Sequence, residues 1–183
     1  MTASIHTSRR AFSLIEILMV IVIMGVLAAV VVPGIGALDA QRQDAAIEEI
    51  KRSLRFARGS AMATGAPTGV QIQTSSGVVF DAVRIDPDTL ALDGVPGPLG
   101  EDFPTRYLSS EFPGITLASV TNGDGSATTD ETIWFKFDGT PHTRNGSGVF
   151  TSDNASDCAI EVDYAGGTRT IVVHAFTGFV DEL

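Results

Sequence analysis

Apolar and charged residues are distributed differently in three successive zones of the chain. In the first zone, residues 17–38 form a run of 22 residues without one charged side chain. A helix rises about 1.5 Å per residue, so this run would extend about 33 Å, close to the roughly 30 Å hydrocarbon core of a bilayer. We therefore expect a transmembrane helix over residues 12–38.

The second zone, residues 39–65, changes from uniformly apolar to periodic. Apolar residues recur there at spacings of 3, 4, 3 and 4, which is the repeat of one helical face. The sequence Gly65-Ala66-Pro67 then ends the helix. The pattern predicts an amphipathic continuation of the same helix. The residues of its apolar face are Ile47, Ile50, Leu54, Ala57 and Ala61.

Charged side chains of the second zone lie mostly off that apolar face. Glu48 precedes Lys51 by three residues and Arg52 by four, spacings at which ion pairs modestly support a helix. The basic side chains are predicted to form a solvated face rather than a nucleic-acid contact. They are Lys51, Arg52, Arg55 and Arg58.

The third zone, residues 66–183, has the pattern of a β-rich globular domain. Short runs of β-branched and aromatic residues alternate with turns that contain glycine and asparagine. Residues 86–113 contain five prolines and little periodicity, so we expect an extended surface loop there. The predicted fold class is α+β, with the Ile47/Leu54 stripe of the helix packed on an antiparallel sheet or small sandwich. The expected strands lie within residues 70–73, 78–85, 115–120, 132–137, 158–164 and 168–173.

The distribution of charged residues predicts how the expected helix is oriented in the membrane. Arg9 and Arg10 precede the apolar run, and no acidic residue lies before Glu16. Because short basic flanks stay in the cytoplasm, we expect the N-terminus inside and the globular domain outside. The chain carries a net charge of −10, and an acidic domain repels phosphate backbones. No nucleic-acid partner is therefore expected.

The apolar run does not have the form of a cleaved secretory signal. Such a signal has an apolar region of about 7–15 residues followed by a small-residue cleavage site. Here the run continues through Ala28–Val32, so the segment is predicted to remain as an anchor. Glu16 lies near the start of the expected helix over residues 12–38, and a charge at mid-membrane costs roughly 3 kcal/mol. Either Glu16 reaches the interface by snorkelling, or it pairs with a cation within the membrane.

Candidate chemistry elsewhere in the sequence is sparse. The three histidines are far apart, and His174 lies in an apolar stretch that predicts a core or sheet-face position. Cys158 is the only cysteine, so it forms no intrachain disulfide and is expected to be a buried small side chain. Asn122–Glu131 approaches the spacing of a calcium loop, but the twelfth position, which needs a Glu, is Ile133. We predict no catalytic residue, no metal site and no cofactor.

The segment Ala11-Phe12-Ser13-Leu14-Ile15-Glu16 resembles the class III signal of type IV pilins and type II secretion pseudopilins. The resemblance implies that residues 1–11 are a leader, that prepilin peptidase cuts between Ala11 and Phe12, and that Phe12 is then N-methylated. Glu16 would become the fifth residue of the mature chain. Its implied role is to pair with the N-terminal amine of a neighbouring subunit's Phe12 and so help set the subunit register in a filament. Ala11 departs from the family's usual Gly, so cleavage is expected to be slower.

Pro33 lies where many members of that family have a helix-perturbing proline. Proline removes a helical hydrogen bond and clashes with the preceding turn, so a kink is expected there. A helix end at the membrane surface is the alternative. The periodic residues that follow favour continuation.

The later part of the chain resembles the GspH/FimT family of minor pseudopilins. The similar segments are Leu54–Ala61, Ile133–Gly139 and Thr177–Val180, and residues 86–113 match nothing in that family. The resemblance implies a single-pass protein of the bacterial inner membrane with a periplasmic domain over residues 66–183. The implied partners are other pseudopilins, prepilin peptidase and an inner-membrane assembly platform.

Three functions fit these observations. The first is a minor pseudopilin, without enzymatic activity, at or near the tip of a type II secretion pseudopilus, where it supports export of folded proteins across the outer membrane. The second is a FimT/FimU-like minor pilin in type IV pilus assembly or DNA uptake, although DNA binding needs a basic surface. The third is a membrane-anchored enzyme unrelated to pili. The sequence does not decide between the first two.

Overall fold

The computed structural model describes residues 13–73, 79–86, 89, 91–96, 106–128, 130–145 and 148–183, with only the backbone described for residues 29–38, 79, 80 and 106. Two compact units divide the chain, residues 1–41 and residues 42–183. The long helix α1, Leu14–Thr64, contributes to both units.

In the first unit, α1 carries the apolar zone of the sequence. The backbone is helical through Pro33, so the helix continues there, as the periodic residues after it predicted. The kink at Pro33 stays a prediction. Among the described residues, no helix has a long enough apolar stretch to cross a membrane. The predicted span, residues 12–38, reaches beyond the described side chains at both ends and also stays a prediction.

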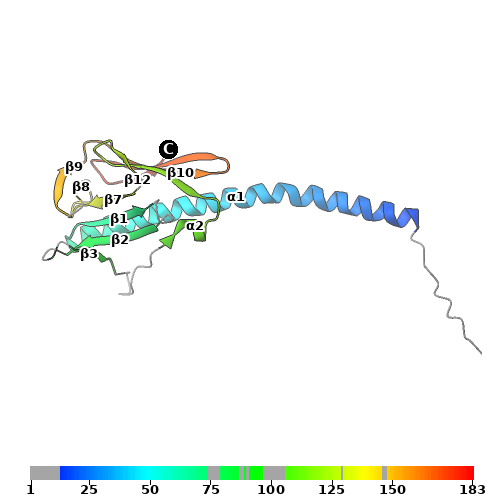
Figure 1. Ribbon diagram of the computed structural model, residues 1–183, viewed down its shortest axis with the longest axis horizontal. Helices are drawn as coiled ribbons and strands as arrows, with labels where there is room; N and C mark the ends of the chain where they lie inside the picture. Colours follow the sequence, from blue (N-terminus) through cyan, green and yellow to red (C-terminus); the bar gives the residue numbers. More distant parts are fainter. Residues whose placement is uncertain are drawn as a thin grey trace, which may run out of the picture. The chain divides into compact units, whose positions relative to one another are not determined.

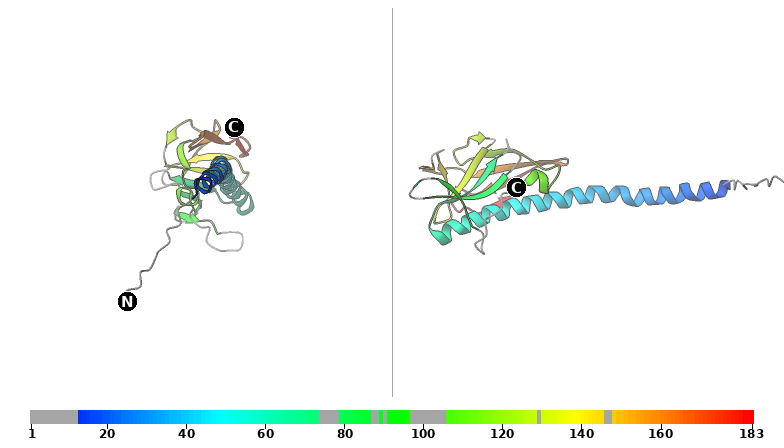
Figure 2. Two further views of the ribbon diagram at one scale, coloured as in Figure 1. Left: turned by 90° about the vertical axis from the view of Figure 1, so that its right-hand side faces the viewer. Right: turned by 60° about the horizontal axis from the view of Figure 1, so that its bottom comes forward.

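The second unit contains two antiparallel sheets, and the last part of α1 belongs to the same unit (Figures 1 and 2). The first sheet has the order β3-β2-β1-β7-β8-β9, with β4 also paired to β2, and the second has the order β12-β11-β10-β5-β6. The first sheet consists of β1 (Thr68–Gln73), β2 (Val79–Ile85), β3 (Leu92–Gly94), β4 (Arg106–Tyr107), β7 (Asp130–Phe135), β8 (Pro141–Arg144) and β9 (Phe150–Asp153). The second consists of β5 (Thr116–Thr121), β6 (Ala127–Thr128), β10 (Cys158–Tyr164), β11 (Gly167–Val173) and β12 (Val180–Glu182).

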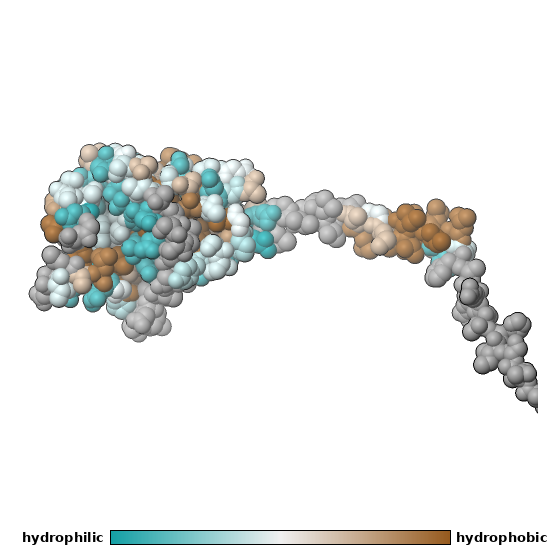
Figure 3. Space-filling view, in the orientation of Figure 1, coloured by the Kyte–Doolittle hydropathy of each residue, from teal (hydrophilic) through white to brown (hydrophobic). Residues whose placement is uncertain are grey.

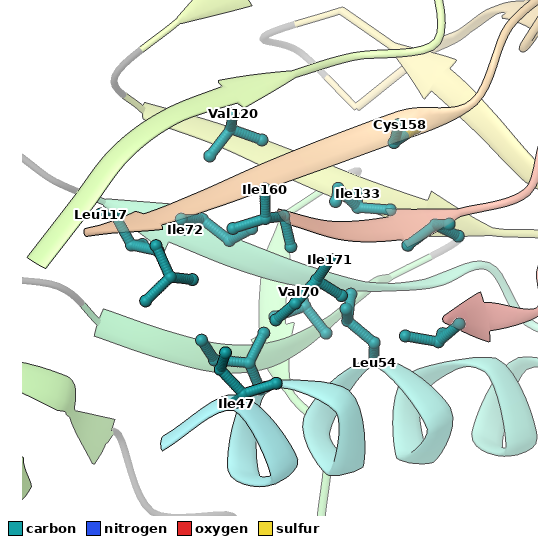
Figure 4. Packing of buried hydrophobic residues seen from close by; sticks show 14 of the residues in the cluster. Ile47, Leu54, Val70, Ile72, Leu117, Val120, Ile133, Cys158, Ile160 and Ile171 are labelled. Carbon is teal, nitrogen blue, oxygen red and sulfur yellow. The ribbon is translucent and has the colours of Figure 1, made fainter. Parts of the chain in front are cut away.

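The helix and both sheets share one hydrophobic core. Ile47, Ile50 and Leu54 of α1 are at most 1% exposed, as the apolar face predicted. They belong to the same buried cluster as Val70 of β1 and Ile160 of β10. Figure 4 shows Ile47 and Leu54 of the helix converging with side chains of the strands. Burying a large aliphatic side chain stabilises a fold by about 1.5–3 kcal/mol. The α+β class, a helix packed on antiparallel sheets, is confirmed.

A smaller cluster covers the other face of the first sheet. Successive side chains of a strand point to opposite faces, and Ile133 and Phe135 of β7 both lie in the main core. Trp134, between them, therefore points the other way, where it packs with Val83 and Ile85 of β2. Both faces of this sheet are thus partly covered.

The predicted surface loop over residues 86–113 proves to be partly structured. The described part contains β3, β4 and a short helix, α2 (Leu108–Glu111). Val95 is 4% exposed, and Leu108 is 2% exposed and belongs to the main core. These elements are two to four residues long, which is too short for a periodic pattern to reveal them.

The basic face of α1 does more than contact solvent. Lys51 pairs with Glu48 at 2.6 Å, as predicted, whereas Arg52 pairs with Glu49 at 3.6 Å. Arg58 donates to two backbone carbonyls, Gly139 at 3.2 Å and Thr177 at 2.9 Å. This arginine therefore ties the β7–β8 turn and the segment before β12 to the end of the helix.

Candidate functional site

The predicted processing and assembly residues lie at the start of α1. Ala11 and Phe12 fall outside the described residues. The carbonyl of Ser13 accepts from the backbone N–H of Glu16 at 3.0 Å and of Ile17 at 3.3 Å, so the helix begins there. Glu16 is exposed in the first helical turn. A carboxylate is favoured in that position because the helix dipole places partial positive charge at the N-terminus.

Glu16 lies within a continuous exposed apolar surface. Every large apolar side chain from Leu14 to Leu27 is between 51% and 83% exposed, and Figure 3 shows this stretch of the helix as a hydrophobic surface. Soluble monomers rarely expose contiguous apolar patches of more than a few hundred Å². This part of α1 therefore requires an apolar partner, either a membrane or other protein.

Cys158 and its surroundings form a buried structural cluster. Cys158 is 0% exposed, and burial raises the pKa of its thiol to about 11. The side-chain amide of Asn154 donates to its Sγ at 3.0 Å. The thiol is thus protonated and unreactive at neutral pH, and the prediction of a buried small side chain is confirmed.

The segment Asn122–Glu131, whose residue spacing approaches that of a calcium-binding loop, is held by hydrogen bonds within the loop. Asn122 is 3% exposed and its Oδ1 accepts from the Gly123 N–H at 2.8 Å. Asp124 Oδ1 accepts from both the N–H and the hydroxyl of Ser126, at 2.8 and 2.6 Å. These bonds, the Ser126 side-chain bond first, lower the pKa of Asp124. Over the part of the chain that the structure describes, no group of three or more His, Cys, Asp or Glu residues could hold a metal ion.

His174 lies just beyond the end of a strand, so the core or sheet-face position predicted for it is wrong. Strand β11 ends at Val173, and the His174 side chain is 43% exposed. Its Nδ1 lies 3.0 Å from Asp157 Oδ2, and Asp157 Oδ1 accepts from the Ala175 N–H at 2.8 Å. The pair holds the turn that follows β11.

The structure also brings together a cluster of basic side chains that the sequence pattern did not predict. Antiparallel pairing places Trp134 of β7 opposite His142 of β8, and Arg144 follows two residues later. His142 is 1% exposed, and Arg144 Nε donates to its Nε2 at 2.7 Å. A guanidinium has no acceptor, so the proton of this neutral imidazole resides on Nδ1. Burial, followed by the charges of Arg144 and Lys136, lowers the pKa of His142 to about 4.

Arg144 is held in place from three sides. Besides its bond to His142, its Nη1 donates to the Gly148 carbonyl at 2.5 Å, and its guanidinium carbon lies 5.7 Å from the centre of the Trp134 ring. Burial lowers the pKa of this arginine. Among the described residues, no carboxylate lies within ion-pair distance of it.

Beside this cluster lies a pocket of about 320 Å³, which we call the β8 pocket. Two of its lining residues are exposed aromatic rings, Phe137 at 67% and Phe150 at 47%. Lys136 and Arg144 are visible in the sequence as single basic residues, but only the pairing of β7 with β8 brings them to one pocket. The β8 pocket is lined by Pro67, Lys136, Phe137, His142, Arg144 and Phe150.

Comparisons with known proteins agree with the N-terminal signal and with the fold. Residues 6–32 match the prokaryotic N-terminal methylation motif. The fold is similar to that of the minor pseudopilin EpsH from the type 2 secretion system of Vibrio cholerae, with 10% sequence identity, a TM-score of 0.52 and coverage of 76% of this chain and 94% of that chain. The type IV minor pilin FimU of Pseudomonas aeruginosa has 14% identity and a TM-score of 0.47, with coverage of 76% and 87%. No curated protein matches the sequence.

The motif and the EpsH-like fold together confirm the resemblance to pilin-like proteins of GspH/FimT type. They do not distinguish a secretion system from a pilus.

Proposed function

We propose that this chain, which carries a prepilin-type methylation motif on a pilin-like fold, is a minor pseudopilin of a type II secretion system. Its α1 segment anchors the precursor in the inner membrane with the globular domain in the periplasm. After cleavage between Ala11 and Phe12, the same segment packs among other subunits at or near the tip of a short pseudopilus. The filament then supports export of folded proteins across the outer membrane, and the chain itself performs no catalysis.

The observation that carries this proposal is the coincidence of the motif with the exposed apolar surface. Residues 6–32 match the motif, and the exposed apolar side chains lie between Leu14 and Leu27 in the same segment. One helix can serve both environments, because hydrocarbon chains and the apolar core of a filament each remove such side chains from water. In either environment the Glu16 carboxylate needs a cation, and the amine of a neighbouring Phe12 would supply it.

The mature N-terminus is the decisive measurement. We expect intact-mass analysis of the protein from membranes to find a chain that begins at N-methylated Phe12 when prepilin peptidase is present, and at Met1 when it is deleted. Ala11→Gly should be processed faster than the natural chain. A chain that still begins at Met1 beside active peptidase would overturn the proposal.

Assembly is tested separately through Glu16. Glu16→Ala should be processed normally but should be lost from sheared filaments and from crosslinks to other subunits, because the amine of the neighbouring Phe12 loses its partner. The matched control is Glu161→Ala, which removes an outward-facing carboxylate from β10 in the globular unit. Deletion of the gene should abolish exoprotein secretion and leave twitching intact. The opposite phenotype would assign the chain to a type IV pilus.

A further inference from the structure

The β8 pocket combines two cations with exposed aromatic rings, and neither feature is used by the proposed filament function. We propose that it binds a carboxylate carried by an apolar peptide segment of a partner protein. Arg144 and Lys136 would bind the carboxylate, and Phe137 and Phe150 would cover the neighbouring apolar side chains. The site goes beyond the proposed function and does not depend on filament assembly.

The basic side chains of the β8 pocket favour a carboxylate as its ligand. Its lining includes Lys136 and Arg144 but no acidic side chain among the described residues. Lys136 pairs with Asp153, whose side chain is 68% exposed, whereas the Arg144 guanidinium has no carboxylate partner in the described part of the chain. The domain is otherwise strongly acidic, since the chain's net charge is −10. Because Lys136 is paired with Asp153, the Arg144 guanidinium is the positive charge that favours an anionic ligand on such a surface.

A second pocket, of about 390 Å³, is also lined by Arg144 but does not favour an anion. Its lining includes the carboxylates of Asp130 and Glu131, which would repel a bound carboxylate. The anion is therefore directed to the β8 pocket.

Arg144 is already arranged for this task before any ligand binds. The His142 Nε2, the Gly148 carbonyl and the Trp134 ring hold the guanidinium in one position. Arginine binds carboxylates through a planar fork of donors, and a side chain that is already fixed loses less conformational freedom when it binds. Nη2 makes no hydrogen bond among the described residues, so a donor remains for the ligand.

The aromatic part of the pocket requires an apolar group beside the carboxylate. The rings of Phe137 and Phe150 are exposed, and Pro67 completes the apolar lining. Aromatic residues grouped with an arginine are the usual composition of energetically dominant sites in protein interfaces. A volume of about 320 Å³ also matches a few side chains of a peptide rather than a small inorganic ion. The occupant is therefore a short peptide segment with one acidic residue between apolar ones.

The test uses the full chain in a neutral detergent and two synthetic peptides. Their sequences are Ala-Leu-Glu-Leu-Ala and Ala-Leu-Gln-Leu-Ala, each blocked at both ends, and binding is measured by isothermal titration calorimetry. We expect the Glu peptide to bind at least about tenfold more tightly than the Gln peptide, because only its carboxylate pairs with the two cations. Trp134 is the only tryptophan, so its fluorescence gives an independent signal next to Arg144.

Substitutions of single cations distinguish binding in the β8 pocket from attraction to the charge of the whole domain. Arg144→Gln and Lys136→Gln should each weaken the Glu peptide by about tenfold. Arg84→Gln removes the same charge from an exposed position of the same sheet, away from the pocket, and should leave binding unchanged. Circular dichroism checks that each variant is folded. If the Arg144 variant does not fold, the affinity of the Lys136 variant for the Glu peptide tests the proposal.

Four results would overturn the proposal. They are equal affinity for the two peptides, an equal loss in the Arg84 variant, affinity for acetate alone as high as for the Glu peptide, and no binding of the Glu peptide at millimolar concentration.

Discussion

At the scale of single residues, burial decides the chemistry of the titratable groups. His142 and Cys158 are both at most 1% exposed, and burial favours the neutral form of each. It lowers the pKa of His142 to about 4 and raises that of Cys158 to about 11. Neither group changes its charge near neutral pH. Both act by occupying space and by holding neighbouring polar atoms.

His142 makes the stability of the fold dependent on pH. Its pKa is about 4 in the folded chain and about 6.5 in the unfolded chain, so the unfolded chain binds more protons between these values. Stability is therefore complete above about pH 6.5 and is lost as the pH falls toward 4. We expect the free energy of unfolding to fall by at most about 2 kcal/mol between about pH 7 and about pH 5.

Urea unfolding of the natural chain and of His142→Gln at both pH values measures this loss. The Gln variant lacks the titrating group and should lose correspondingly less. Hydrogen bonds, that from the Ala175 N–H first, lower the pKa of Asp157 from its usual range, so this carboxylate contributes little to the change between about pH 7 and about pH 5. Parallel pH profiles for the two proteins would contradict the prediction.

At the scale of elements, turns far apart in sequence are joined at the end of α1. Arg58 donates to the carbonyls of Gly139 and Thr177, and its guanidinium lies 5.5 Å from the Phe179 ring centre. Gly178 has a φ of +62°, and a Cβ there would lie 1.9 Å from the Gly139 carbonyl oxygen. Glycine is thus required at this position both by its own backbone and by the neighbouring turn.

Gly178→Ala should destabilise the domain because it adds strain at positive φ and pushes the two turns apart. We expect a loss of about 2–3 kcal/mol in the free energy of unfolding. Gly94→Ala is the matched control, because Gly94 lies in strand β3 with no atom within 4 Å of an added Cβ. Its effect should be within about 0.5 kcal/mol. Equal effects of the two substitutions would show that the turns are not in contact in solution.

At the scale of the whole molecule, the two units differ in which side chains they expose to solvent. Residues 13–28 expose apolar side chains that need a membrane or other protein, whereas residues 42–183 bury one continuous core and carry a strongly acidic surface charge. Lys51, Arg52 and Arg55 of α1 each lie near a glutamate, so their positive charges are balanced locally. This balance of charge opposes binding to phosphate backbones.

We expect the full chain to show no DNA binding that persists at physiological salt. Binding to duplex DNA depends on neutralising phosphates with Lys and Arg, and a net charge of −10 opposes it. Fluorescence anisotropy with labelled duplex and single-stranded DNA, at low and at physiological salt, measures this. Saturable binding at physiological salt would favour the alternative role in DNA uptake.

Sequence patterns predicted the large elements of this fold and missed the small ones. The stripe from Ile47 to Ala61 predicted the buried face of α1 because a helical repeat is a local property. The strands around Val70, Ile133 and Ile160 were likewise expected. The short elements between residues 86 and 113 were not, since the burial of Leu108 depends on the core that it joins.

What the sequence by itself determined is the N-terminal signal and the apolar pattern that predicts an anchor. The uncharged run after Glu16, the basic residues before it and the methylation motif over residues 6–32 are all written in consecutive residues, so no folding is needed to recognise them. The tertiary structure alone decided which distant side chains meet. The β8 pocket exists because β7, β8 and β9 pair in one register and carry Lys136, Arg144 and Phe150 to one place, and such a register depends on all the strands at once.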